Sequence, residues 1–187
     1  MADILNSKVF SFGGRSSLLF YLFPFAFTIL FCANLKAQDE MPDNLAPPPV
    51  KIISKEEKSA LEGTSDIKGR TKLTLDLMEV RLKKAEELKT SESYSGVLSE
   101  LGTFQALMDD ALKFLHRNDT GQGKVMDTYK RFEIALRTFT PRIELIRREI
   151  PDRYEFYVRR LLKTVRDARA KAVEPMFSST ILPGKEN

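Results

Sequence analysis

Few side chains in this chain have the types and spacing that catalysis or metal binding requires. His116 is the only histidine and Cys32 is the only cysteine. A di-iron helical site needs two Glu-x-x-His helices and a serine hydrolase needs a Gly-x-Ser-x-Gly turn, and the sequence has neither. We therefore expect no metal, no cofactor, no catalytic residue and no enzymatic activity.

Neighbouring carboxylates are the remaining candidates for acid–base chemistry. They occur at Glu56 and Glu57, at Glu86 and Glu87, and at Asp109 and Asp110. Adjacent residues on a helix point about 100° apart, so such a pair does not form a site by itself. An enzyme or ligand-binding bundle would need carboxylates from different helices, and no residue pattern selects a pair.

Positive charge concentrates in the second half of the chain. Residues 54–123 contain 11 Lys and Arg against 13 Asp and Glu, whereas residues 124–172 contain 14 against 7. A basic region is typical of a protein with an anionic partner. Four acidic residues precede a basic residue by four positions, which favours local ion pairs on a solvated helix face. The four pairs are Asp127–Arg131, Glu133–Arg137, Glu144–Arg148 and Glu155–Arg159.

One basic row is a candidate anion-binding face. Arg159, Lys163 and Arg166 lie opposite the apolar positions 158, 161 and 165 if residues 152–174 form a helix. Arginine suits bidentate contact with phosphate or carboxylate groups. Arg147 and Arg169 lie nearer the apolar stripes, so we expect them to form pairs between helices.

The first 37 residues have the order of a secretory signal. Lys8 and Arg15 precede the apolar residues 16–33, and Ala37 is a small residue at which a peptidase could cut. Cleavage after Ala37 would release an exported protein, periplasmic or secreted. Two alternatives are an uncleaved membrane anchor over residues 16–33 and a lipid on Cys32. Export argues against nucleic acid as the anionic partner.

Residues 38–63 read as a linker. Its three consecutive prolines, at positions 47–49, favour an extended and stiff spacer because proline lacks an amide donor and has a fixed φ. A short helix is allowed over residues 51–62. Residues 175–187 contain two prolines and a glycine, which favours a disordered tail.

Helical periodicity dominates residues 64–174, which we expect to form the folded domain. Apolar residues recur at steps of four and three over residues 71–89, 94–115, 125–150 and 152–174. Gly102 would allow a neighbour to approach closely, and Pro141 predicts a kink or a restart within the third helix. The expected fold is all-α, with four principal helices in an up-down bundle. The alternative is an elongated, coiled-coil-like hairpin that dimerises through leftover apolar surface.

These features favour an exported, non-enzymatic helical module that binds a protein partner or a second copy of itself. A second hypothesis is an envelope-surface protein that binds anionic lipid or polymer through its basic helical face. The third is the enzyme or ligand-binding bundle described above.

Overall fold

The computed structural model describes residues 44–120 and 123–178. Over these residues the chain forms five helices and no strand, so the all-α prediction is confirmed. The described residues form five helices where four principal ones were expected, because a short helix precedes the four long ones. The predicted leader, its cleavage point after Ala37 and residues 179–187 of the predicted tail lie outside the described residues.

The first two helices begin at polar caps. Ser54 and Glu57 form a reciprocal capping box at the start of α2, and Asp66 caps α3 by accepting from the backbone N–H of Gly69. Pro151 separates the last two helices, because proline disfavours the helical conformation of the residue before it, here Ile150. The five helices are α2 (Lys55–Glu62), α3 (Ile67–Thr90), α4 (Tyr94–Arg117), α5 (Gly123–Glu149) and α6 (Asp152–Ser178).

Two prolines lie inside helices. Helix α5 runs without a break through Pro141, because Leu136, Phe139 and Ile143 are buried on both sides of the proline and hold the two halves in register. The helix α6 continues past Pro175 to Ser178, although the sequence predicts a disordered tail from residue 175. Met176 packs against the core, which offsets the loss of one amide donor near the helix end.

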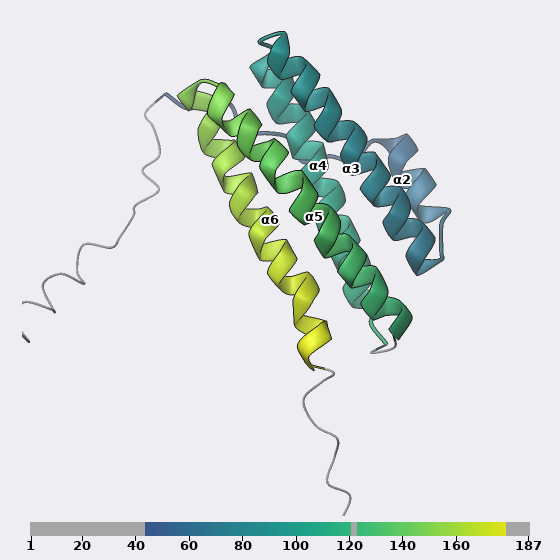
Figure 1. Ribbon diagram of the computed structural model, residues 1–187. Helices are drawn as coiled ribbons and strands as arrows, with labels where there is room; N and C mark the ends of the chain where they lie inside the picture. Colours follow the sequence, from purple (N-terminus) through teal and green to yellow (C-terminus); the bar gives the residue numbers. More distant parts are fainter. Residues whose placement is uncertain (1–43, 121–122, 179–187) are drawn as a thin grey trace, which may run out of the picture. The chain divides into compact units, whose positions relative to one another are not determined.

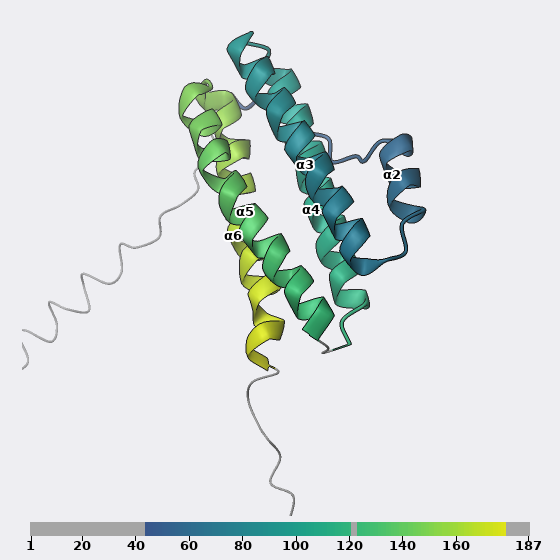
Figure 2. The same ribbon diagram turned by 45° about the vertical axis from the view of Figure 1, so that its right-hand side comes forward.

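Four long helices lie side by side in the described part of the chain (Figures 1 and 2). Helix α3 packs mainly on α4, and α5 packs mainly on α6; α3 also packs on α5, and α4 on α6. The ion pairs Arg81–Glu100 and Glu133–Arg169 fit antiparallel α3–α4 and α5–α6 pairs. The short helix α2 packs on α3.

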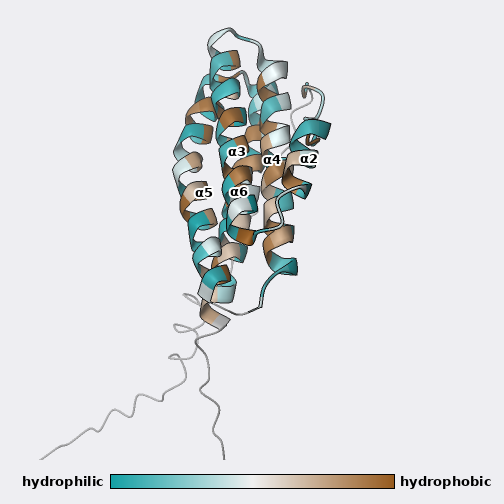
Figure 3. Ribbon diagram, turned by 90° about the vertical axis from the view of Figure 1, so that its right-hand side faces the viewer, coloured by the Kyte–Doolittle hydropathy of each residue, from teal (hydrophilic) through white to brown (hydrophobic). Residues whose placement is uncertain are grey.

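The core lies between these four helices. Figure 3 shows hydrophobic positions turned toward neighbouring helices and hydrophilic positions turned outward. The largest fully buried side chains include Phe104, Tyr129 and Phe132. The apolar stripes predicted from the sequence supply this core, as the burial of Val125, Leu136 and their heptad partners shows.

Candidate interaction surface

The segment before α2 covers the groove between α4 and α6. We call residues 44–53 the strap; it is non-helical and crosses behind α4 in Figure 1. The backbone N–H of Ala46 donates to the carbonyl of Arg153 at 3.1 Å, and the Tyr157 hydroxyl donates to the carbonyl of Ala46 at 2.8 Å. Ala46 is only 6% exposed. The described part of the predicted spacer is therefore extended but packed on the helices.

Gly102 allows the strap to lie against α4. A Cβ atom at this position would lie 2.3 Å from the carbonyl oxygen of Val50 and 3.3 Å from Cβ of Pro49. Any other residue would force the strap backbone away from the helix. The sequence predicted a close approach at this glycine, but the neighbour is the strap and not another helix.

Helix α2 covers the outer side of the contact between α3 and α4. Arg81 of α3 donates to Glu57 of α2 at 3.0 Å and to Glu100 of α4 at 2.9 Å. Burial alone would lower the pKa of Arg81, but hydrogen bonds to Glu100 and Glu57 raise it above its ordinary value. Leu61 of α2 is fully buried beneath this cluster. Together, α2 and the strap cover two of the four contacts between long helices.

The contact between α3 and α5 is bridged by charged side chains. Arg142 of α5 donates to both carboxylate oxygens of Glu86 and of Glu79, at 2.7 to 2.9 Å. The hydrogen bonds that Arg142 donates to Glu86 hold the pKa of Arg142 well above its usual range. Lys89 also pairs with Glu149 between the same helices.

Arginine also links α5 to α6. Arg147 donates to Glu144 at 2.7 Å and to Glu155 of α6 at 2.5 Å. Glu133 is buried; its burial opposes ionisation, but hydrogen bonds from Arg169 and Arg137 outweigh this and lower its pKa. Both expected interhelical pairs, those of Arg147 and Arg169, are confirmed. Much of the basic excess in the sequence therefore serves internal contacts.

The predicted anion-binding residues all lie on the exposed side of α6. Arg159 pairs with Glu155 at 3.6 Å, and its guanidinium lies 5.8 Å from the Phe156 ring centroid. Arg159 and Arg166 line a surface cleft of about 360 Å³ between α5 and α6, together with Arg147 and Glu144. Lys163 is exposed but does not line this cleft. The three residues therefore share a helix side, and two of them share a cleft.

The outer side of α5 carries exposed apolar residues. Ile134 is 47% exposed and Leu145 is 53% exposed. Thr138 and Pro141 lie between them and are exposed as well, so the four residues follow steps of four, three and four. This spacing places them on one helix side, the α5 strip, between the contacts of α5 with α3 and α6. The heptad spacing of these four residues is present in the sequence, but the strip was not among the predicted binding surfaces.

The only histidine, His116, contacts a buried tyrosine. The Nδ1 atom of His116 lies 3.2 Å from the hydroxyl of Tyr129, whose ring is fully buried. Burial, with the charge of Asp119, raises the pKa of Tyr129 to about 12. Tyr129 is therefore a neutral hydrogen-bond partner at ordinary pH.

The adjacent carboxylates do not converge on a site. Glu57 binds Arg81, Glu86 binds Arg142, and Asp110 binds Arg70 at 3.0 Å. Burial raises the pKa of Asp109, while the positive charges of Lys51 and Lys113 oppose this shift. Within residues 44–120 and 123–178, no group of three or more His, Cys, Asp or Glu residues is placed to hold a metal ion.

None of the helices in the described ranges combines the length and apolar character needed to cross a membrane. The apolar residues 16–33 lie outside these ranges. Comparison of the chain with protein-family models, with curated proteins and with solved structures finds no match. The geometry of the described residues is therefore the basis for the function proposed next.

Proposed function

We propose that this protein is an exported, non-enzymatic interaction module whose long helices act as one up-down bundle and present the α5 strip to a partner. The partner is a protein, or a second copy of the chain. The observation that carries this proposal is the uneven covering of the helices. The strap and α2 cover two contacts, whereas no other segment of residues 44–120 and 123–178 covers the two contacts on either side of α5.

The α5 strip has the features of a small binding surface. Ile134 and Leu145 are large apolar side chains, half exposed, and separated by three helical turns or about 16 Å. Apolar groups rimmed by charge are typical of protein interaction sites. The arginine bridges on either side hold α5 against its neighbours, so the strip is presented on a rigid support.

The test is a double substitution, Ile134→Ser with Leu145→Ser, in the full chain held in a non-ionic detergent. Sedimentation equilibrium measures self-association, and capture from the native envelope measures partner binding. We expect the double variant to lose most of its association while its circular dichroism spectrum is unchanged. Val80→Ser on α3 is the matched control, because Val80 is 47% exposed but lies outside the strip.

Association that persists in the double variant, or is lost equally in Val80→Ser, would exclude the strip as the binding surface. Surface substitutions of this kind change the free energy of unfolding by no more than about 0.5 kcal/mol. A change in association therefore reports on the surface itself.

A second candidate function is binding to an anionic envelope surface through Arg159, Lys163 and Arg166. The observation that favours it is the exposure of Lys163 and Arg166, which have no ion-pair partner among the described residues. We expect Lys163→Glu with Arg166→Glu to abolish salt-dependent binding to vesicles that contain phosphatidylglycerol. The control, Lys84→Glu with Lys113→Glu, makes the same change of net charge elsewhere; equal loss in both variants would show that only total charge matters.

A further inference from the structure

The contact between α3 and α5 has a fixed register. Arg142 lies opposite Glu79 and Glu86, and Lys89 lies opposite Glu149. The two helices therefore run parallel, offset by about 60 residues, with 1.5 Å of rise per residue. This register places Lys68 of α3 level with residue 128 of α5, between Lys124 and Arg131.

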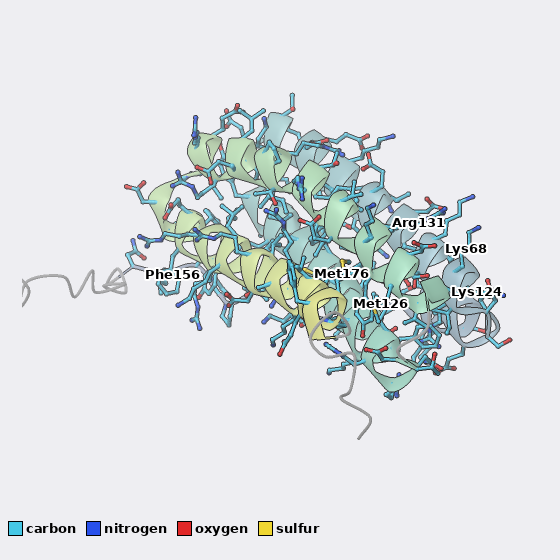
Figure 4. The ribbon with its side chains drawn as sticks, turned by 60° about the horizontal axis from the view of Figure 1, so that its bottom comes forward. Lys68, Lys124, Met126, Arg131, Phe156 and Met176 are labelled. Carbon is cyan, nitrogen blue, oxygen red and sulfur yellow. The ribbon has the colours of Figure 1, made fainter. Side chains whose placement is uncertain are left out.

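The same sides of both helices face this contact at their beginnings. On α5, Lys124 and Arg131 precede Arg142 by 18 and 11 residues, and both spacings return to the same helix side. On α3, Lys68 and Lys72 share the side that carries Glu79 further along. In Figure 4, Lys68, Lys124 and Arg131 all lie at the end of the structure where both helices begin. We call Lys68, Lys72, Lys124 and Arg131 the basic cluster.

The basic cluster differs from the rest of the contact in its lack of acidic partners. All four side chains are exposed, and in the described part of the chain none of them forms an ion pair. The expected pair Asp127–Arg131 is absent there, whereas the other three expected local pairs form. Asp66, near Lys68 in sequence, accepts from the backbone N–H of Gly69.

Four positive charges within about two helical turns repel one another, and a bound anion would relieve that repulsion. The first turns of α3 and α5 contain no acidic residue. The cap residue Asp66 offsets the positive end of α3, whereas no acidic side chain lies in the first turn of α5 to do the same there. Arg131 can bind two oxygens of one group at once, while lysine ammonium groups act as point charges. A tetrahedral dianion matches this set better than a single carboxylate does.

We infer that the basic cluster is a binding site for phosphate groups, formed by Arg131 and Lys124 of α5 with Lys68 and Lys72 of α3. Lys124 and Arg131 are about 10 Å apart along the helix, so the site accommodates more than one phosphate group. This site is separate from the α6 row and from the α5 strip. Its ligand is a soluble phosphate compound or a lipid phosphate headgroup.

The test compares Arg131→Gln with Lys130→Gln in the full chain in a non-ionic detergent. The two variants lose the same charge at adjacent positions, but Lys130 lies about 100° around the helix and away from α3. Isothermal titration calorimetry at low salt uses inorganic phosphate and tripolyphosphate as soluble probes. Flotation with phosphatidylglycerol vesicles provides the lipid arm.

We expect saturable binding of tripolyphosphate that Arg131→Gln weakens by at least about tenfold and Lys130→Gln changes by less than about twofold. Lys68→Gln should weaken binding as well, because it contributes from the neighbouring helix. Vesicle binding with the same pattern and no binding of soluble probes would identify lipid headgroups as the source. Equal effects of Arg131→Gln and Lys130→Gln, or no saturable binding to any probe, would overturn the inference.

Discussion

Two sides of the described helices, the α4–α6 groove under the strap (the covered side) and the outer side of α5 (the open side), are held together by different interactions. On the covered side, the strap lies in the α4–α6 groove through close backbone packing at Gly102 and hydrogen bonds of neutral groups at Ala46. On the open side, α5 is joined to α3 and α6 by arginine–carboxylate bridges at Arg142, Arg147 and Glu133.

This difference shows how one chain divides its surface. Close packing needs a small residue and a matching backbone, and it removes the groove from contact with other molecules. Ion pairs leave the side chains part-exposed, so the open side keeps its shape while its apolar and basic groups stay accessible. Substitutions and pH should therefore affect the two sides differently.

Gly102→Ala should cause the largest loss of stability, and it should loosen the covered side. Alanine favours a helix over glycine by about 0.5–1 kcal/mol, but the added Cβ would overlap the carbonyl of Val50, a backbone atom that cannot rotate away. We expect a net loss of about 1–2 kcal/mol in the free energy of unfolding, measured by urea denaturation, and faster proteolysis of the strap.

Gly123→Ala is the control for this substitution, because outside its chain neighbours and its own helix backbone no atom of the described residues lies within 4 Å of the corresponding Cβ. Its stability should equal or exceed that of the wild type. A Gly102→Ala variant as stable as Gly123→Ala, with a protected strap, would show that the strap does not depend on this contact.

Arg142→Gln should destabilise the open side, and the loss in the free energy of unfolding should be smaller than that caused by Gly102→Ala. The substitution leaves Glu79 and Glu86 facing each other without their shared cation, and we expect a loss of about 1 kcal/mol in urea denaturation at pH 7. Arg142→Lys should restore only part of this loss, since one ammonium cannot make bidentate contacts with two carboxylates. Complete restoration by lysine would show that charge alone is sufficient.

Tyr157→Phe tests how much one neutral hydrogen bond contributes to the covered side. It removes the hydroxyl that donates to the carbonyl of Ala46 but keeps the ring, so we expect a loss of about 0.5–1 kcal/mol. Amide hydrogen exchange, followed by mass spectrometry, should increase in residues 44–53 and stay constant in α5. An equal increase in α5 would mean that the two sides are not independent.

Lowering the pH should have the smallest effect of these changes. The loss of stability should appear first on the open side. Hydrogen bonds from Arg147 lower the pKa of Glu144, and the bonds from Arg169 and Arg137 lower that of Glu133 despite its burial. A carboxyl whose pKa is lower in the folded state stabilises the fold above its ordinary value of 4.5, and this contribution is lost as the pH falls through the folded-state value.

Amide exchange in α5 should therefore increase below about pH 4.5 before exchange in the strap does. Glu133→Gln should be less stable at pH 7, and its stability should depend less on pH in this range. If the strap were the first segment to exchange in acid, the assignment of ion pairs to the open side would be contradicted.

The four long helices were predictable because each buries an apolar stripe that repeats with the helical period. The sequence left open whether the third long helix kinks or restarts at Pro141. The burial of Leu136, Phe139 and Ile143 on both sides of the proline decides for one continuous helix. The extension of α6 past Pro175 has the same origin in the packing of Met176.

The candidate surfaces were predictable only in part. Exposure of Arg159, Lys163 and Arg166 follows from the helical wheel of α6, and the pairing of Arg147 and Arg169 follows from their place beside the apolar stripe. The α5 strip could have been found from its spacing. Whether it is exposed depends on which helices surround α5, and the sequence pattern of α5 alone does not contain that information.

The sequence by itself determined the helices, their apolar sides and the basic excess of the second half, because these depend on local periodicity and composition. Only the tertiary structure decided which charges are used in bridges and which remain in the basic cluster, because α3 and α5 meet in a register set by packing between distant segments. It also decided that the proline-rich residues 44–53 lie against α4 and α6, since the groove that receives them exists only after both helices have packed.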